Sequence, residues 1–195
     1  MCTKVSGLCG LGRCWMDNTG LDKYCNWGKA NGATDARIIH PSTVVTAAWV
    51  RWKCRYGCPV YGERYTCPPD SPTHQQTRDM LDCYSRAILF HQEQPALPDR
   101  SKIGKNFLSR MIELEGEIFK DGYYKAFVFL AGPCHLCKEC AKSKGLPCNF
   151  GAEARPCMES SGIDVFQTAR NNGFNIIPLR EKNETRNIFC LMLVD

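Results

Sequence analysis

The residues of this sequence with the clearest chemistry are four closely spaced cysteines. They lie in the stretch GPCHLCKECAKSKGLPC, with the pattern C-x2-C-x2-C-x7-C, at Cys134, Cys137, Cys140 and Cys148. Overlapping C-x2-C pairs let three thiolates converge, and such a run with a more distant fourth cysteine holds many [4Fe–4S] clusters. Structural zinc usually uses two separated C-x2-C pairs. Because Lys, Glu and His rather than apolar residues separate these cysteines, the pattern predicts metal binding, with iron–sulfur favoured over zinc.

A second group of cysteines lies in the stretch KCRYGCPVYGERYTCPPDSPT. Cys54, Cys58 and Cys67 follow the pattern C-x3-C-x8-C there, and the glycines and prolines around them favour turns over a helix or a strand. A metal centre would hold such a loop in place. Three cysteines make an incomplete tetrahedral set, so either a fourth ligand comes from elsewhere or one iron is left open. We predict that Cys157 supplies the fourth ligand, which assumes that it folds close to this loop.

The other cysteines carry weaker signals. Cys83 and Cys190 are expected to be small buried residues. The N-terminal group has irregular spacing and is either an additional cluster site or a set of free thiols, with the last member packed on a short helix: Cys2, Cys9, Cys14 and Cys25. Two metal sites are predicted, and the N-terminal group is left open as a third.

The composition of the 195 residues sets the class of protein. A hydrophobic fraction of 44% is enough for one ordinary core, and fourteen cysteines are more than such a core needs. The start of the sequence does not look like a signal peptide, and no stretch approaches the roughly 18 apolar residues of a membrane span. We therefore expect a cytoplasmic protein with no membrane segment, in which cysteines serve metal or redox chemistry. The net charge of +5 is scattered, so no nucleic-acid partner is expected.

The residue pattern predicts the elements that must position the cysteines. Strands are predicted at 36–40, 43–52, 86–91, 124–131, 174–179 and 187–194, and helices at 21–30, 73–83, 101–121 and 162–172. Thr73 is a predicted N-cap, and the run from Ser161 to Asp164 matches a capping box. Apolar residues recur at helical spacing in the long helix and predict one buried stripe, at Phe107, Met111, Leu114 and Ile118.

Strands and helices alternate from residue 73 onward, as in folds where right-handed crossovers join parallel strands. This alternation predicts a single α/β domain over residues 35–195, after a cysteine- and glycine-rich extension at residues 1–34. The expected architecture is a mixed, mostly parallel sheet with flanking helices and both cysteine loops at one end. The group from Cys134 to Cys148 directly follows the most apolar predicted strand, 124–131, and sites in open α/β sheets collect at that edge.

Motifs for other chemistry are absent from the sequence. It has no G-x-S-x-G, no H-E-x-x-H, no P-loop and no glycine fingerprint for a dinucleotide. No catalytic residue and no flavin or nucleotide cofactor are therefore predicted. His135 stands between two predicted ligands and is expected to hydrogen-bond a cluster sulfur or to face water.

The sequence resembles a family of cysteine-rich proteins that are predicted to bind metal and occur in anaerobic bacteria and archaea. Three stretches carry the resemblance, in the order WVRWKCRYGCPVYGERYTCPPDSPT, GPCHLCKECAKSKGLPC and ARPCMESSGIDVFQTARNNGF. It covers about residues 20–195. The resemblance implies metal binding of the iron–sulfur kind through the matching cysteines, which are Cys54, Cys58, Cys67, Cys134, Cys137, Cys140 and Cys148. Cys157 is not clearly part of that set, and the cysteines before residue 20 depart from the family pattern.

Together these features predict a cytoplasmic iron–sulfur protein with two [4Fe–4S] clusters, which transfers electrons to or from a redox partner protein. Two other functions stay open. A zinc-stabilised interaction module would use the same thiolates. An enzyme would instead bind its substrate at a cluster whose open iron lies in the three-cysteine loop.

Overall fold

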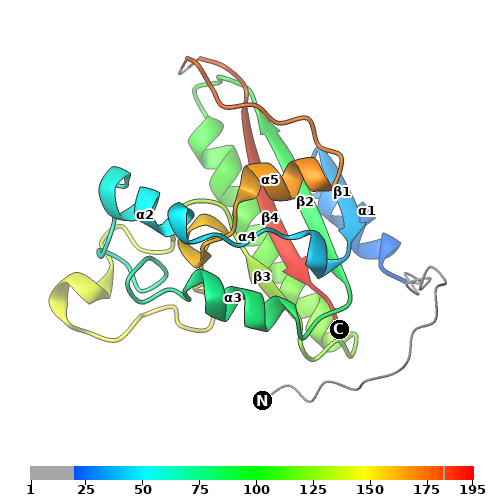
Figure 1. Cartoon of the computed structure of the whole chain (residues 1–195), viewed down its shortest axis with the longest axis horizontal. Helices are drawn as coiled ribbons and strands as arrows, with labels where there is room; N and C mark the ends of the chain where they lie inside the picture. Colours follow the sequence, from blue (N-terminus) through cyan, green and yellow to red (C-terminus); the bar gives the residue numbers. More distant parts are fainter. Residues whose placement is uncertain (1–19, 182) are drawn as a thin grey trace.

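A computed structural model describes residues 20–181 and 183–195 of the chain. The possible site at Cys2, Cys9 and Cys14 lies outside these residues. The described chain forms a four-stranded sheet with the strand order β1-β2-β4-β3 (Figure 1). Its strands are β1 (Asp35–Ile39), β2 (Ala87–Gln94), β3 (Phe127–Phe129) and β4 (Arg186–Leu193).

Every pair of neighbouring strands in this sheet is antiparallel, so the prediction of a mostly parallel sheet is wrong. β2 and β3 both run opposite to β4, which lies between them. The crossover from β2 to β3 therefore joins two strands of the same direction but leaves a gap one strand wide. β4 fills that gap, and its Met192 pairs with Ile88 on one side and Val128 on the other. The prediction failed because alternation along a sequence does not show that a later strand inserts between two earlier ones.

Helices cover both faces of the sheet (Figure 1). α1 (Asp22–Ala30) and α4 (Arg100–Lys120) pack on one face, and α3 (His74–Leu81) and α5 (Val165–Asn171) on the other. Successive strand side chains point to opposite faces, so each face has its own apolar cluster. The predicted stripe of α4 is confirmed, since each of its residues is at most 1% exposed: Phe107, Met111, Leu114 and Ile118.

The segment predicted as a strand at 43–52 contains no named strand, and its second half is helical. A short 3-10 turn, η1 (Pro41–Thr43), precedes helix α2 (Ala48–Gly57). Val50 is the buried residue of this helix, whereas Trp49 and Trp52 are 47% and 59% exposed. Aromatic and β-branched residues favour strands because they pack on a half-buried sheet surface. The strand prediction failed because the two tryptophans face solvent on a helix instead of packing on the sheet.

Local capping agrees with the sequence at one helix and differs at another. Thr73 caps α3 in a reciprocal capping box with Gln76, as predicted. α5 begins later than predicted, because Asp164 rather than Ser161 is its N-cap and accepts a backbone N–H of the first turn. The segment 174–179, predicted as a strand, is irregular and belongs to no named element.

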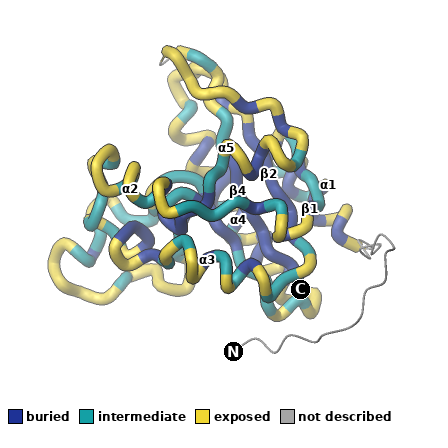
Figure 2. The backbone as a smooth tube through the Cα atoms, viewed as in Figure 1, coloured by how far each residue is buried: buried dark blue, intermediate teal, exposed yellow. Residues whose placement is uncertain are grey.

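The two cysteine groups lie outside the apolar core. Neither apolar cluster of the sheet includes a residue of 45–71 or 132–156, and we call these two segments the cysteine lobe. The lobe projects to the left of the sheet in Figure 1, and Figure 2 shows much of it exposed where the strands are buried. Apolar burial is the main source of folding free energy, so the lobe must be held largely by other interactions.

Candidate metal centres

The first cysteine loop, residues 54–71, starts on the last turn of α2. Cys58 is the C-cap of that helix, and its N–H donates to the carbonyl of Cys54 at 3.2 Å. Residues four apart on a helix share a face, so these two thiols lie near each other. The N–H of Gly62 donates to the carbonyl of Pro68 at 3.0 Å, in a turn where Gly62 has φ of 78°. This turn closes the loop and brings Cys67 back toward the helix.

The electrostatics of the first loop show that its three thiols influence one another. Burial raises the pKa of the Cys54 thiol, and Cys58 and Glu159 raise it further. Burial also raises the pKa of Cys67, where Cys58 again adds to the rise. A thiol must lose its proton to bind a metal, so a positive charge or a metal ion is needed to form the thiolates here.

The second cysteine loop, residues 134–148, surrounds a small cavity of about 10 Å³. All four of its cysteines line this cavity: Cys134, Cys137, Cys140 and Cys148. Cys140 precedes the 3-10 turn η2 (Ala141–Lys144), which ends at Gly145 with a left-handed φ of 65°. That turn reverses the chain so that the fourth cysteine returns to the first three.

Residues of the first loop complete the wall of this cavity. Arg64, Tyr65 and Thr66 line it together with the four cysteines. The hydroxyl of Tyr65 donates to the carbonyl of Leu146 at 2.8 Å. Lys142 of the second loop forms an ion pair with Asp70 of the first. The two cysteine groups are therefore adjacent.

The donor set fits a metal that prefers sulfur. Four thiols around one cavity suit zinc or an iron–sulfur cluster and disfavour magnesium and calcium. Within residues 20–181 and 183–195, no three Cys, His, Asp or Glu side chains are arranged to hold a single ion. The thiols therefore gather around a common space without closing on one point.

Cys157, the predicted fourth ligand of the first loop, lies under the lobe. It forms an isolated parallel bridge with Leu130 and is 7% exposed. Its Sγ accepts the backbone N–H of Ser160 at 3.2 Å, and burial raises the pKa of its thiol well above the ordinary value. It does not line the pocket that Cys54 and Cys58 share, so its role as a ligand stays a prediction.

Two charged residues that the sequence analysis did not single out lie at these sites. Glu159 lines the pocket shared by Cys54 and Cys58, and its Oε2 is buried with no hydrogen-bond partner. Arg64 lines the cavity of the second loop, and its Nε is also buried and without a partner. Buried polar groups are normally satisfied, so both atoms are candidates to contact a ligand. In the sequence, the one feature that points to these two residues is their position: Arg64 lies inside a cysteine motif and Glu159 lies next to Cys157.

Comparison with known proteins gives one match. The family model described as Predicted metal-binding protein (DUF2284) matches residues 37–194. The chain belongs to this family. No curated protein and no solved structure matches the chain.

Membership of DUF2284 confirms the resemblance to a family of predicted metal-binding proteins. The matched range contains all eight predicted ligand cysteines and begins after Cys25. The family description names metal binding without naming a metal. A search of the described helices finds none with both the length and the apolar character to cross a membrane.

His135 faces the long helix as well as the second cysteine loop. Its Nε2 lies 3.4 Å from the hydroxyl of Ser109 on α4. Burial lowers the pKa of this imidazole, and the positive charges of Lys105 and Arg64 lower it further. The neutral ring that these effects favour carries one N–H donor and one acceptor nitrogen.

Proposed function

We propose that this DUF2284 protein is a cytoplasmic iron–sulfur protein that holds two [4Fe–4S] clusters and transfers single electrons to or from a partner protein. The observation that carries the proposal is the cavity of the second loop, lined by Cys134, Cys137, Cys140 and Cys148. Four cysteines in this spacing, gathered around one cavity, are a donor set typical of such a cluster.

The make-up of the cysteine lobe is a second argument. The lobe adds nothing to the apolar clusters of the sheet. Hydrogen bonds such as the one from Tyr65 to Leu146 contribute only about 1 kcal/mol each. Where ligands come together only in the folded state, metal-binding free energy becomes folding free energy. A metal would therefore supply the stabilisation that this lobe does not obtain from burial.

We assign the second cluster to Cys54, Cys58 and Cys67, with a fourth ligand from the segment after residue 156. Cys157 is the residue that the sequence predicts. Glu159 is its competitor, because it lines the pocket shared by two of the three cysteines and has an unpartnered buried oxygen. These two observations support Glu159 as the proposed ligand.

The protein side chains around these sites have separate tasks. A bound cluster would supply one-electron redox chemistry. Tyr65 and Phe150 line the cavity of the second loop and limit the access of water. Arg64 places a positive charge at the same wall, which favours thiolate over thiol. A neutral His135 has an N–H to donate, and donation to a cluster sulfur would raise its reduction potential.

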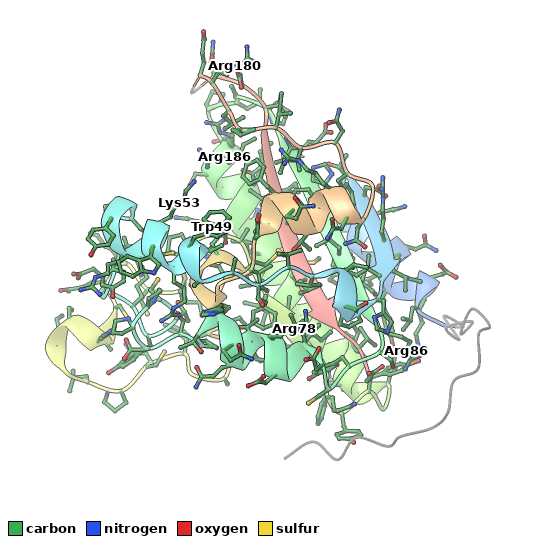
Figure 3. All side chains as sticks on the ribbon, in the orientation of Figure 1. Trp49, Lys53, Arg78, Arg86, Arg180 and Arg186 are labelled. Atoms are coloured by element: carbon green, nitrogen blue, oxygen red, sulfur yellow. The ribbon has the colours of Figure 1, made fainter. Side chains whose placement is uncertain are left out.

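The exposed face of α2 suits the docking of a redox partner. Trp52 and Tyr56 are exposed there and stack with ring centroids 5.7 Å apart. Trp49 and Lys53 project from the same helix, as Figure 3 shows. Aromatic side chains are enriched in protein interfaces, and basic neighbours favour an acidic partner.

A zinc-stabilised interaction module is the second candidate function. The same cavity supports it, because four thiolates are also a structural zinc site. Zinc would hold the cysteine lobe together without carrying electrons. Metal identity therefore separates the two functions.

The deciding measurement is the iron, sulfide and zinc content per chain of protein purified without oxygen. Two [4Fe–4S] clusters correspond to about eight irons and eight sulfides. Cys137→Ser is expected to lose about half of the iron, whereas Cys25→Ser, outside both loops, keeps it. Zinc without sulfide would refute electron transfer and support the interaction module.

A further inference from the structure

A large cleft lies beside the second cysteine loop. Its volume is about 1120 Å³, comparable to small-molecule binding sites of roughly 300–1000 Å³. One wall is formed by the first turns of α4, and another by Cys134, His135 and Cys137. Arg186, at the start of β4, also lines the cleft and is labelled in Figure 3.

The lining of this cleft is strongly basic. Glu159 is its one carboxylate, against five cationic side chains that come from separate segments: Arg64, Arg100, Lys105, Lys138 and Arg186. Four of these cations, Arg64, Lys105, Lys138 and Arg186, form no ion pair with any residue of 20–181 or 183–195. Positive charges gathered in a concave site raise the local concentration of anions.

Two backbone and side-chain features add to this preference. The side chain of Asp99, the N-cap of the 21-residue helix α4, accepts no capping hydrogen bond. The N–H of Arg100 donates to the carbonyl of Leu97, and the N–H groups after it in the first turn receive no side-chain cap and favour an anion. Ser101, Gly104 and Lys105 of the same helix end line the cleft. Arg64 adds a buried Nε that has no hydrogen-bond partner.

We infer that this basic cleft binds a small organic anion with at least two carboxylate or phosphate groups, next to the second cysteine loop. More than one anionic group is required because the cations come from several walls, and a single small group would reach only some of them. The concave shape favours a small molecule over a protein surface. The inference goes beyond electron transfer and does not depend on which metal the cysteines hold.

The test is isothermal titration of the full chain, purified without oxygen and carrying its metal, with two probes. Inorganic pyrophosphate represents phosphates, and tricarballylate represents carboxylates. Lys105→Gln and Arg186→Gln are each expected to weaken binding of the preferred probe at least about fivefold. Lys102→Gln is the matched control, because it removes the same charge from the exposed side of the same helix outside the cleft lining. It is expected to change affinity less than about twofold.

Each outcome has a defined meaning. Binding of one probe names the class of anionic group, and binding of both supports the shared chemistry. No saturable binding of either probe, or equal weakening by Lys102→Gln and Lys105→Gln, would overturn the inference. Metal and sulfide are measured in the same samples, before and after titration. Binding of an anion by protein that contains no iron would support the inference about the cleft and would refute only the proposed electron transfer.

Discussion

The ion pair between Glu115 and Arg155 anchors the second cysteine segment to the long helix. Glu115 lies on α4 and is 7% exposed. The guanidinium of Arg155 donates three hydrogen bonds to its carboxylate, at 2.8 to 3.0 Å. Arg155 also donates to the carbonyls of Ala152 and Ala154. Replacing Glu115 with glutamine keeps the shape of the side chain and removes its charge.

The expected loss of stability for Glu115→Gln is about 2–3 kcal/mol. Breaking a buried ion pair costs about 3–5 kcal/mol, because the remaining charge is left without its partner. Two features reduce the cost here. The side chain of Arg155 is 19% exposed, and the glutamine oxygen can still accept a hydrogen bond. For a chain of this size such a loss lowers the melting temperature by about 4–12 °C.

Thermal unfolding followed by circular dichroism, at equal metal content, measures this loss. Glu113→Gln is the matched control, since Glu113 lies on the same helix and pairs with Arg110, with both side chains about half exposed. An exposed pair of this kind contributes at most about 1 kcal/mol. If Glu115→Gln lowered the melting temperature no more than Glu113→Gln does, the assignment of a buried anchoring pair would be refuted. The double replacement Glu115→Leu with Arg155→Met is expected to recover most of the loss.

Other parts of the chain give three further tests. Burial raises the pKa of Tyr24 from 10.0 to about 12. The unfolded chain therefore releases this proton first as the pH rises, and the free energy of unfolding should decline between pH 10 and about 12. Tyr24→Phe is expected to flatten this decline, as measured by urea titrations at several pH values. Glu159→Gln is expected to reduce bound iron by up to half, and Cys157→Ser is expected to leave it unchanged. Loss of iron in Cys157→Ser but not in Glu159→Gln would instead identify Cys157 as the fourth ligand. A chelator is expected to speed amide exchange in residues 54–71 and 134–148 and to spare β2 and β4, whereas uniform loss of protection would contradict a separate cysteine lobe.

Elements with a strong local signal could be predicted from the sequence. The stripe that begins at Phe107 marks α4 because apolar residues recur at the helical period over about three turns. Thr73 marks the start of α3 because its hydroxyl satisfies a free N–H of the first turn. The helix α2 could not be predicted in this way. Its tryptophans favour a strand when they pack on a sheet, and Trp52 instead lies at the surface.

Contacts between distant segments could be predicted only in part. The spacing of Cys134, Cys137 and Cys140 indicates one site because the three are close along the chain. Nothing in the spacing shows that Arg64 completes the wall of their cavity, seventy residues earlier in the sequence. The same limit applies to Glu159 and to the insertion of β4 between two earlier strands. Such contacts depend on tertiary packing, which local pattern does not encode.

The second cysteine segment, between Leu130 and Pro156, leaves the edge of the sheet and returns to it. β3 pairs only three residues with β4, and the chain leaves the sheet directly after them. It returns at the same point, where Leu130 donates to the carbonyl of Pro156 and accepts from the N–H of Met158, both at 2.9 Å. The entropic cost of closing a loop rises slowly with its length. A loop whose two ends are fixed by the sheet can therefore be long at little extra cost. Polar residues and thiols that would be costly in an apolar core can therefore be placed in this segment while the sheet supplies the stability.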